Sequence, residues 1–188
     1  MFDYLSPDEE RKLIEELPEQ PEGFRQLYRC YFPRVYAYTA ARIGNHADTE
    51  DLVADVFVKI VEALDRFEYR GSGSFAAWVF RIAYNTVQQF YRQRQSLVSF
   101  DALTRVADYD HSKPESIYLN KERSTLVHAM LETLSPRRQE ILTMRYFGGL
   151  RNMEIAEVLG LNEKTVASHI SRGLEDLQKK YRKQDVPL

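Results

Sequence analysis

The segment EIAEVLGLNEKTVASHISRGL, from Glu154 to Leu174, decides how the C-terminal part of this chain folds. Apolar residues recur at helical spacing on both sides of Gly160, and the glycine interrupts the pattern as a tight turn does. Asn162 follows, and its side chain can accept hydrogen bonds from the first free amides of a helix. The segment therefore predicts two helices joined by a short turn, which is a helix-turn-helix.

The second of these helices has an apolar and a polar side. Val166, Ile170 and Leu174 recur every fourth residue and are expected to face the first helix. The polar side carries Lys164, Thr165, Ala167, Ser168, His169 and Arg172. In DNA-binding helix-turn-helix domains such a side enters the major groove. A plain helical hairpin packed in a bundle is the alternative interpretation.

Composition places the chain among globular proteins. It has 188 residues, of which 44% are apolar, enough for one domain or two small ones. No run of 18 apolar residues occurs, and the start MFDYLSPDEE lacks the basic and apolar blocks of a signal peptide. We therefore expect a cytoplasmic protein without membrane insertion. The single cysteine, Cys30, is expected to be a buried apolar residue.

The net charge of −2 conceals an uneven distribution. Residues 1–22 hold two basic and eight acidic side chains, whereas 23–95 and 135–188 each hold ten basic and seven acidic ones. Two mildly basic parts suit two DNA contacts of modest strength, although ordinary solvated surface has similar counts.

Sparse glycine and proline with helical periodicity predict an all-α fold. The expected helices are 7–17, 23–43 with Pro33 inside, 48 to about 67, 75–94, 117–134 and 137–147, before the helix-turn-helix. The third has an apolar stripe that includes Val61. We expect two small helical domains joined by a flexible linker. The divisions are an acidic N-terminal helical extension at 1–22, a first domain at 23–95, a linker at 96–116 and the helix-turn-helix domain at 117–183.

Nothing in the sequence favours an enzyme. The chain has no glycine-rich phosphate loop, its four histidines lack ligand spacing, and Cys30 has no histidine partner in a recognisable signature. We expect no catalytic residues, no cofactor and no metal.

Five blocks of sequence, in order, resemble the extracytoplasmic-function group of bacterial sigma-70 factors, the detachable subunits that direct RNA polymerase to promoters. The blocks are FRQLYRCYFPRVYAYTAARIG, ADTEDLVADVFVKIVEALDRF, GSFAAWVFRIAYNTVQQFYR, LETLSPRRQEILTMRYFGGL and NMEIAEVLGLNEKTVASHISRGLEDL. The resemblance covers about residues 23–181. It implies a sigma-2-like domain, which binds core polymerase and the −10 element, followed by a sigma-4-like domain, which binds the −35 element.

The resemblance implies three sets of binding residues. Asp48, Glu50, Asp51 and Asp55 would pair with basic side chains of core RNA polymerase. Arg70, Ser72, Arg81, Tyr84, Asn85, Gln88 and Arg92 would hold the melted −10 strand, with Asn85 the best candidate for a base contact. Lys164, Thr165, Ser168, His169 and Arg172 would contact the −35 duplex.

The partners implied are core RNA polymerase, promoter DNA and an anti-sigma factor. Two alternatives remain open. One is an autonomous helix-turn-helix regulator. The other is a sigma-like decoy that binds an anti-sigma factor, which the absence of basic residues at Tyr84, Ala167 and His169 would favour.

The acidic helix at 7–17 lies outside the strongest resemblance. One hypothesis is that it folds over a basic DNA-facing surface and lowers stray DNA binding. The other is that it simply extends the first domain by packing on it.

Overall fold

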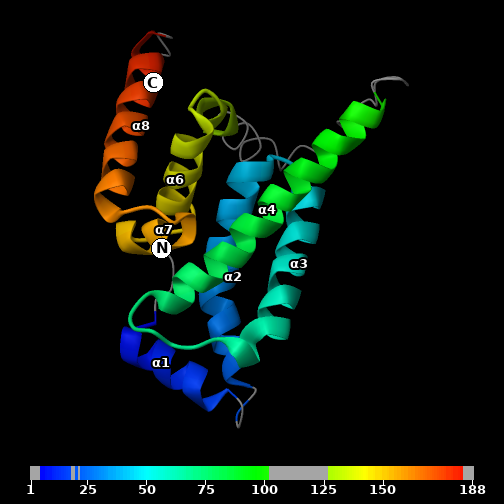
Figure 1. Ribbon diagram of the computed structural model, residues 1–188, viewed down its shortest axis with the longest axis vertical. Helices are drawn as coiled ribbons and strands as arrows, with labels where there is room; N and C mark the ends of the chain where they lie inside the picture. Colours follow the sequence, from blue (N-terminus) through cyan, green and yellow to red (C-terminus); the bar gives the residue numbers. More distant parts are fainter. Residues whose placement is uncertain (1–4, 18–19, 21, 102–126, 184–188) are drawn as a thin grey trace, which may run out of the picture.

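The computed structural model describes residues 5–17, 20, 22–101 and 127–183, and every regular element within them is helical. The elements are α1 (Pro7–Glu16), α2 (Gly23–Ile43), α3 (His46–Ala63), the short 3-10 helix η1 (Leu64–Arg66), α4 (Ser74–Asp101), α6 (Pro136–Tyr146), α7 (Asn152–Leu159) and α8 (Glu163–Lys183). Residues 127–132 are also helical. The all-α prediction is confirmed (Figure 1).

Local sequence signals account for most helix ends. Ser6 and Glu9 form a reciprocal capping box at the start of α1. Gly44 ends α2 with φ 71°, the left-handed conformation that glycine adopts without strain. Asn45 then caps α3 by accepting a hydrogen bond from the amide of Asp48 at 3.2 Å. The expected break between the second and third helices is therefore found, and α3 begins at His46.

One helix prediction needs correction. α4 continues to Asp101 and so includes 96–101, which the sequence assigned to the linker. The rest of that linker, and the start of the helix expected at 117–134, lie outside the described residues. Ser135 stands before α6 but its side chain makes no capping hydrogen bond. A polar residue before proline marks the helix start here without capping it.

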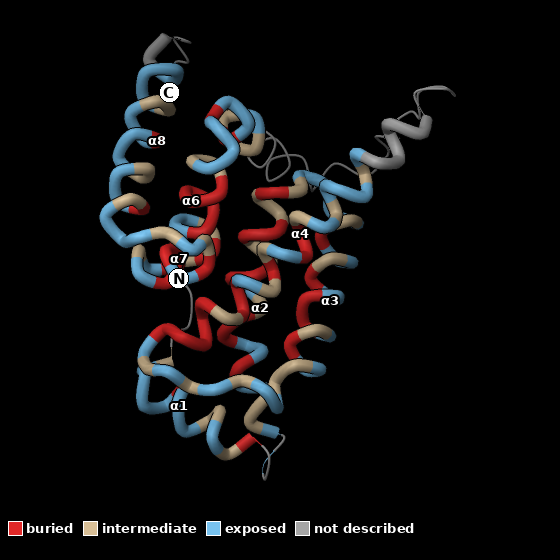
Figure 2. Tube along the Cα trace, in the orientation of Figure 1, coloured by how far each residue is buried: buried red, intermediate tan, exposed pale blue. Residues whose placement is uncertain are grey.

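The buried residues run through the middle of the molecule (Figure 2). Phe75, Phe80 and Tyr38 are almost completely buried, and Tyr38 meets Phe80 edge to face with ring centroids 5.7 Å apart. Cys30 is buried, as expected. The same core cluster continues into Ile155 of α7.

The two halves of the chain pack directly on each other. α7 lies against α4 and α6 against α2, while α6, α7 and α8 form a compact unit of their own (Figure 1). The sequence left the relative placement of the two halves open, and the structure brings them into one body. No helix within the described residues is both long and apolar enough to cross a membrane.

Candidate nucleic-acid and partner interfaces

The outer face of α3 carries the predicted acidic residues. Asp48, Asp51 and Asp55 recur at spacings of three and four, so they share one side of the helix. Asp48 forms an ion pair with Arg94 at 3.6 Å, and Asp55 forms one with Lys59 at 2.7 Å. Glu50 lies 3.3 Å from the ring of His46. Asp51 is exposed and has no ion-pair partner among the described residues, which leaves its carboxylate available to a partner.

The same face has an apolar part that sequence reasoning missed. Val58 and Val61 are each 54% exposed, and Val58 follows Asp51 by two turns. The prediction that Val61 belongs to the buried stripe is wrong. Apolar residues of this helix occupy a wider arc than the roughly 100° that faces the core in a typical surface helix. The width of this arc could have indicated that some of these residues are exposed. The face therefore combines carboxylates with exposed valines, a chemistry suited to a protein partner.

The loop between η1 and α4 is fixed by its own hydrogen bonds. Ser74 Oγ donates to the carbonyl of Gly71 at 2.7 Å and accepts from the amide of Arg70 at 3.1 Å. Gly71 and Gly73 have φ values of 119° and 87°, which side-chain-bearing residues rarely adopt. Arg70 and Ser72 are exposed on this ordered loop. Ser74 thus holds this loop in place, a role that the sequence analysis did not identify.

The predicted −10 residues of α4 share one side of the helix by their spacing, but their side chains have different neighbours. Asn85 lies in a groove of about 520 Å³ between α3 and α4. Arg81 instead donates from Nη2 to the carbonyl of Glu157 in α7, and Gln88 Nε2 donates to Glu140 in α6 at 3.5 Å. Tyr84 is half-buried and Arg92 is exposed.

The groove beside Asn85 adds residues that the sequence analysis did not select. Its walls are Lys59, Glu62, Ala63, Arg66, Ile82, Asn85, Thr86 and Gln89. Lys59 Nζ donates to Asp55 at 2.7 Å and to Thr86 Oγ1 at 3.2 Å, so two hydrogen bonds fix the ammonium group beside the groove. Amide, hydroxyl and cationic groups beside an open hollow can hold an unstacked base and its phosphate.

The helix-turn-helix forms as predicted. Gly160 takes φ 65° and ends α7, and Asn162 Oδ1 accepts from the amide of Thr165 at 3.1 Å at the start of α8. Ile155 and Val166 are fully buried between the helices. Leu174 is exposed, although the sequence predicted that it would belong to the apolar stripe. Each step of four residues turns about 400° around the helix axis, which is about 40° more than a full turn. Two such steps from Val166 therefore carry Leu174 away from the packed side of α8. Gly173 takes the inner position, against Leu142.

The predicted −35 residues occupy the outer side of α8. Lys164, Ser168 and Arg172 are exposed, and Thr165 and His169 are half-buried. Partial burial lowers the pKa of His169, and the nearby Arg138, Arg137 and Arg172 lower it further. The imidazole is therefore neutral in the free chain at neutral pH.

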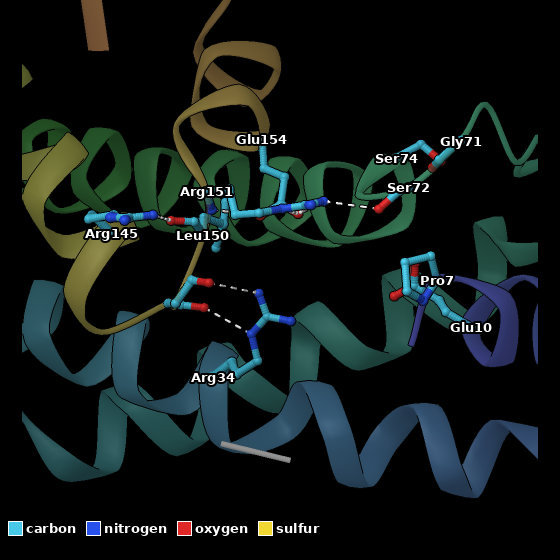
Figure 3. Close-up of polar contacts among 12 residues, drawn as sticks. Pro7, Glu10, Arg34, Gly71, Ser72, Ser74, Arg145, Leu150, Arg151 and Glu154 are labelled. Atoms are coloured by element: carbon cyan, nitrogen blue, oxygen red, sulfur yellow. Dashed lines mark hydrogen bonds and ion pairs between the residues drawn. The ribbon is translucent and has the colours of Figure 1, made fainter. Parts of the chain in front are cut away.

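A buried polar network joins the two halves. The hydroxyl of Tyr38 in α2 donates to Glu140 in α6 at 2.5 Å, and Arg42 Nε lies 3.4 Å from the same carboxylate. Burial raises the pKa of Glu140, although Arg42 and the Tyr38 hydrogen bond oppose the shift. Burial also raises the pKa of Tyr38 well above its usual value. Nearby, Arg34 Nε donates to the carbonyl of Gly148 at 2.9 Å (Figure 3).

The N-terminal helix packs on the first half. Tyr31 donates a hydrogen bond to the buried carboxylate of Glu10, which attaches α1 to α2. The hydroxyl of Tyr69 donates to the carbonyl of Pro7 at 3.3 Å, and the guanidinium of Arg11 lies 5.9 Å from the centre of the Tyr69 ring. α1 therefore touches the loop that carries predicted −10 residues.

Comparisons with known proteins identify the family of this fold. Residues 27–97 match Sigma-70 region 2, and residues 124–177 match Sigma-70, region 4. The chain is 28% identical over 160 residues to the ECF RNA polymerase sigma factor BldN of Streptomyces coelicolor, and it spans 60% of that protein's length. It is also 28% identical over 177 residues to the ECF RNA polymerase sigma-E factor of Escherichia coli, of which it covers 92%.

Two solved structures share the fold. The complex of CnrH with the cytosolic domain of CnrY matches 95% of this chain and 99% of its own with a TM-score of 0.70 at 24% identity. The sigma factor RpoE of Bartonella quintana, bound to the anti-sigma factor NepR, matches 85% of this chain with a TM-score of 0.64 at 23% identity. The chain belongs to the sigma-70 family of RNA polymerase sigma factors, and within it to the extracytoplasmic-function group.

Proposed function

We propose that the chain is a promoter-specificity subunit that binds core RNA polymerase in the cytoplasm and starts transcription at promoters with −10 and −35 elements. The observation that best supports this proposal is that Sigma-70 region 2 is followed by Sigma-70 region 4 in one chain. An autonomous helix-turn-helix regulator has no need of the first of these. Catalysis would belong to the polymerase, and this chain would supply recognition only.

Docking on core polymerase is assigned to the α3 face. Its carboxylates, Asp51 and Asp55 above all, would meet basic side chains and set association rate and register. The exposed Val58 and Val61 would supply the apolar centre of the contact.

DNA recognition is assigned to two surfaces. Asn85 and the groove around it would take one unstacked base of the −10 strand. Arg70 and Arg92, both exposed, would contact phosphates of the strand. Lys164, Thr165, Ser168, His169 and Arg172 would contact the −35 duplex. Because both domains belong to one chain, the second DNA contact becomes intramolecular, and two weak sites add to a useful affinity.

An anti-sigma factor is proposed as a further partner. CnrH and the Bartonella RpoE were each solved with a bound protein, and the latter is described as an anti-sigma factor. A decoy that only binds such a protein is the second candidate, favoured by the absence of basic side chains at Tyr84, Ala167 and His169.

Co-elution with bacterial core RNA polymerase on size exclusion tests the proposal. Wild-type chain should elute with core in a stoichiometric complex, and the triple variant Asp48→Lys/Asp51→Lys/Asp55→Lys should not. Glu175→Lys, on the exposed side of α8, is the charge control and should still bind. A wild-type chain that binds duplex DNA but not core would indicate the autonomous regulator. A chain that binds neither would indicate the decoy.

The acidic helix α1 gives a separate test. Its contact with Tyr69 places it beside the −10 loop, in keeping with a role in limiting DNA binding by the free chain. Deletion of residues 1–20 should then raise polymerase-independent DNA affinity at low salt. Unchanged affinity would leave α1 as a packing helix of the first domain.

A further inference from the structure

Tyr69 precedes the −10 loop, defined as residues 70–74, and its side chain contacts α1 in two ways. The hydroxyl donates to the carbonyl of Pro7 at 3.3 Å, and the guanidinium of Arg11 lies 5.9 Å from the centre of the ring. Arg11 is held in turn by a hydrogen bond of 2.8 Å from its Nε to Glu15. The start of the −10 loop is therefore attached to α1.

α1 is a fixed support for this contact. Tyr31 of α2 donates a hydrogen bond to the buried carboxylate of Glu10. Leu13 and Ile14, further along α1, pack against the main hydrophobic core. The capping box orders the first turn of the helix, which supplies the carbonyl that Tyr69 contacts. The first half of the chain therefore holds α1 in place, and α1 holds Tyr69.

The −10 loop is also attached at its far end and to the other half of the chain. Ser74 ties it to the start of α4, and Ser72 Oγ accepts a hydrogen bond of 3.2 Å from Arg151 (Figure 3). A cavity of about 230 Å³ lies between the loop and α1, and its walls include Ser72 and Glu10. Because packed side chains do not fill this space, the place of the first loop residues depends on Tyr69.

The contact of Tyr69 with α1 lies entirely within the first half of the chain. It therefore does not depend on the helix-turn-helix half, unlike the bond between Ser72 and Arg151. The loop carries the exposed side chains of Arg70 and Ser72, both predicted to hold the melted strand. A loop that is ordered before binding loses less conformational entropy on binding, and its binding groups need supporting contacts to stay in place. Because Tyr69 directly precedes Arg70, a change in its backbone would move the Arg70 side chain.

We infer that Tyr69 is a positioning residue for −10 recognition, through which α1 orients Arg70 and Ser72 towards the melted strand. Tyr69 acts through these two residues and not by its own contact with DNA. α1 thereby contributes to recognition, although the match to Sigma-70 region 2 begins only at residue 27. The role in recognition rests on the proposed function, whereas the support of the loop by α1 does not.

Amide hydrogen exchange of the full chain tests the support of the loop. Tyr69→Ala should speed exchange of the Arg70 and Ser74 amides, which bond within the loop, about tenfold. The lost hydrogen bond and cation–π contact together favour local opening by about this factor. Arg11→Ala removes only the cation–π contact and should have a smaller effect in the same direction. Lys12→Ala, an exposed change of equal charge on α1, is the control and should have none. Unchanged exchange in Tyr69→Ala would overturn the inference.

Selection from randomised 12-nucleotide single strands, by the chain bound to core polymerase, tests recognition. The strand that wild type selects should bind Tyr69→Ala about tenfold more weakly, and single-base changes in it should matter less to the variant. Tyr69→Phe keeps the ring beside Arg11 and should restore most of the affinity.

A purely structural role would change other properties. The urea midpoint of Tyr69→Ala and its affinity for core polymerase should match those of Lys12→Ala. A loss of both in Tyr69→Ala would make Tyr69 a folding residue and would overturn the inference.

Failure of the positioning role and failure of the proposed function are distinguishable. Hydrogen exchange requires neither polymerase nor DNA, so faster exchange in Tyr69→Ala together with a wild-type chain that selects no strand would refute −10 recognition. Faster exchange together with undiminished strand selection by Tyr69→Ala would overturn the positioning role and leave the proposed function intact. These single substitutions keep the acidic side chains of α1, so any effect of that charge on stray DNA binding is unchanged.

Discussion

Arg34 and Gly148 are joined by a hydrogen bond of 2.9 Å although 114 positions separate them in the sequence. The donor is the buried guanidinium of α2, and the acceptor is a backbone carbonyl in the turn between α6 and α7. A side chain at position 148 would place its Cβ 2.6 Å from Phe80 and 2.8 Å from the carbonyl of Met144. Close approach of the two halves therefore requires glycine at this turn.

Gly148→Ala should destabilise the chain and loosen the contact between its halves. Overpacking of this kind costs about 1–3 kcal/mol. Gly160→Ala is the control: its Cβ would meet nothing within 4 Å, so only the positive φ is penalised, by about 1–2 kcal/mol. Urea unfolding gives the stability of each variant, and scattering gives its size. A radius of gyration that increases equally in both variants would show that Gly148 has no special part in docking.

The exposed valines of α3 should matter for polymerase binding and little for folding. Val58→Ser/Val61→Ser removes apolar surface that is already half in water, so the free energy of unfolding should change by less than about 0.5 kcal/mol per site. Affinity for core polymerase should fall about tenfold or more, as expected when central apolar contacts are lost. Met153→Ser, 49% exposed on α7, is the control and should bind core normally. Equal affinities in the two variants would exclude the valines from the contact.

Asn85→Ala should weaken promoter melting more than polymerase binding. The exposed amide beside the α3–α4 groove has no side-chain hydrogen bond among the described residues, so folding should be unaffected. Loss of one base contact typically costs about 1–3 kcal/mol, or roughly five- to 150-fold in affinity for the melted strand. Permanganate reactivity of promoter thymines in the complex with core reports melting, and Gln178→Ala on α8 is the control. Normal melting in Asn85→Ala would move the base contact elsewhere.

Local signals in the sequence predicted most of the helices. Asn162, Gly160 and the Ser6–Glu9 capping box act within four residues, so periodicity and capping chemistry place those helix ends. Val61 and Leu174 were assigned wrongly because helical spacing says which side a residue occupies but not how wide the covering surface is.

The candidate site was predictable only in part. The residue types that suit DNA and polymerase binding were found from the family resemblance, but the partners of Gln88 and Arg81 were not. Those partners lie 52 and 76 positions away, and no local pattern encodes the docking of one half on the other. The same limit hid Glu140, which in sequence is an ordinary polar residue in a helix.

The free energy of unfolding should depend on pH through Glu10, because the carboxyl group of Glu10 is buried where α1 meets α2. Burial raises the pKa of Glu10, against the opposing effects of the Tyr31 hydrogen bond and of Arg34. The folded chain therefore holds this proton more tightly than the unfolded chain does. Its contribution to the free energy of unfolding increases as the pH falls from neutral through the raised pKa and is complete below about 4.5.

Glu10→Gln keeps an acceptor for Tyr31 and carries no charge. It should therefore be more stable than wild type at pH 7.5, and the difference should close as the pH falls towards 4.5. Glu9→Gln is a neighbouring control with the opposite sign, because hydrogen bonds from Ser6 lower the pKa of Glu9. Its carboxylate stabilises the fold above about pH 4.5, and that contribution is lost on acidification. Urea unfolding across this range measures both differences. Parallel curves for wild type and Glu10→Gln would show that the buried carboxyl does not titrate with folding.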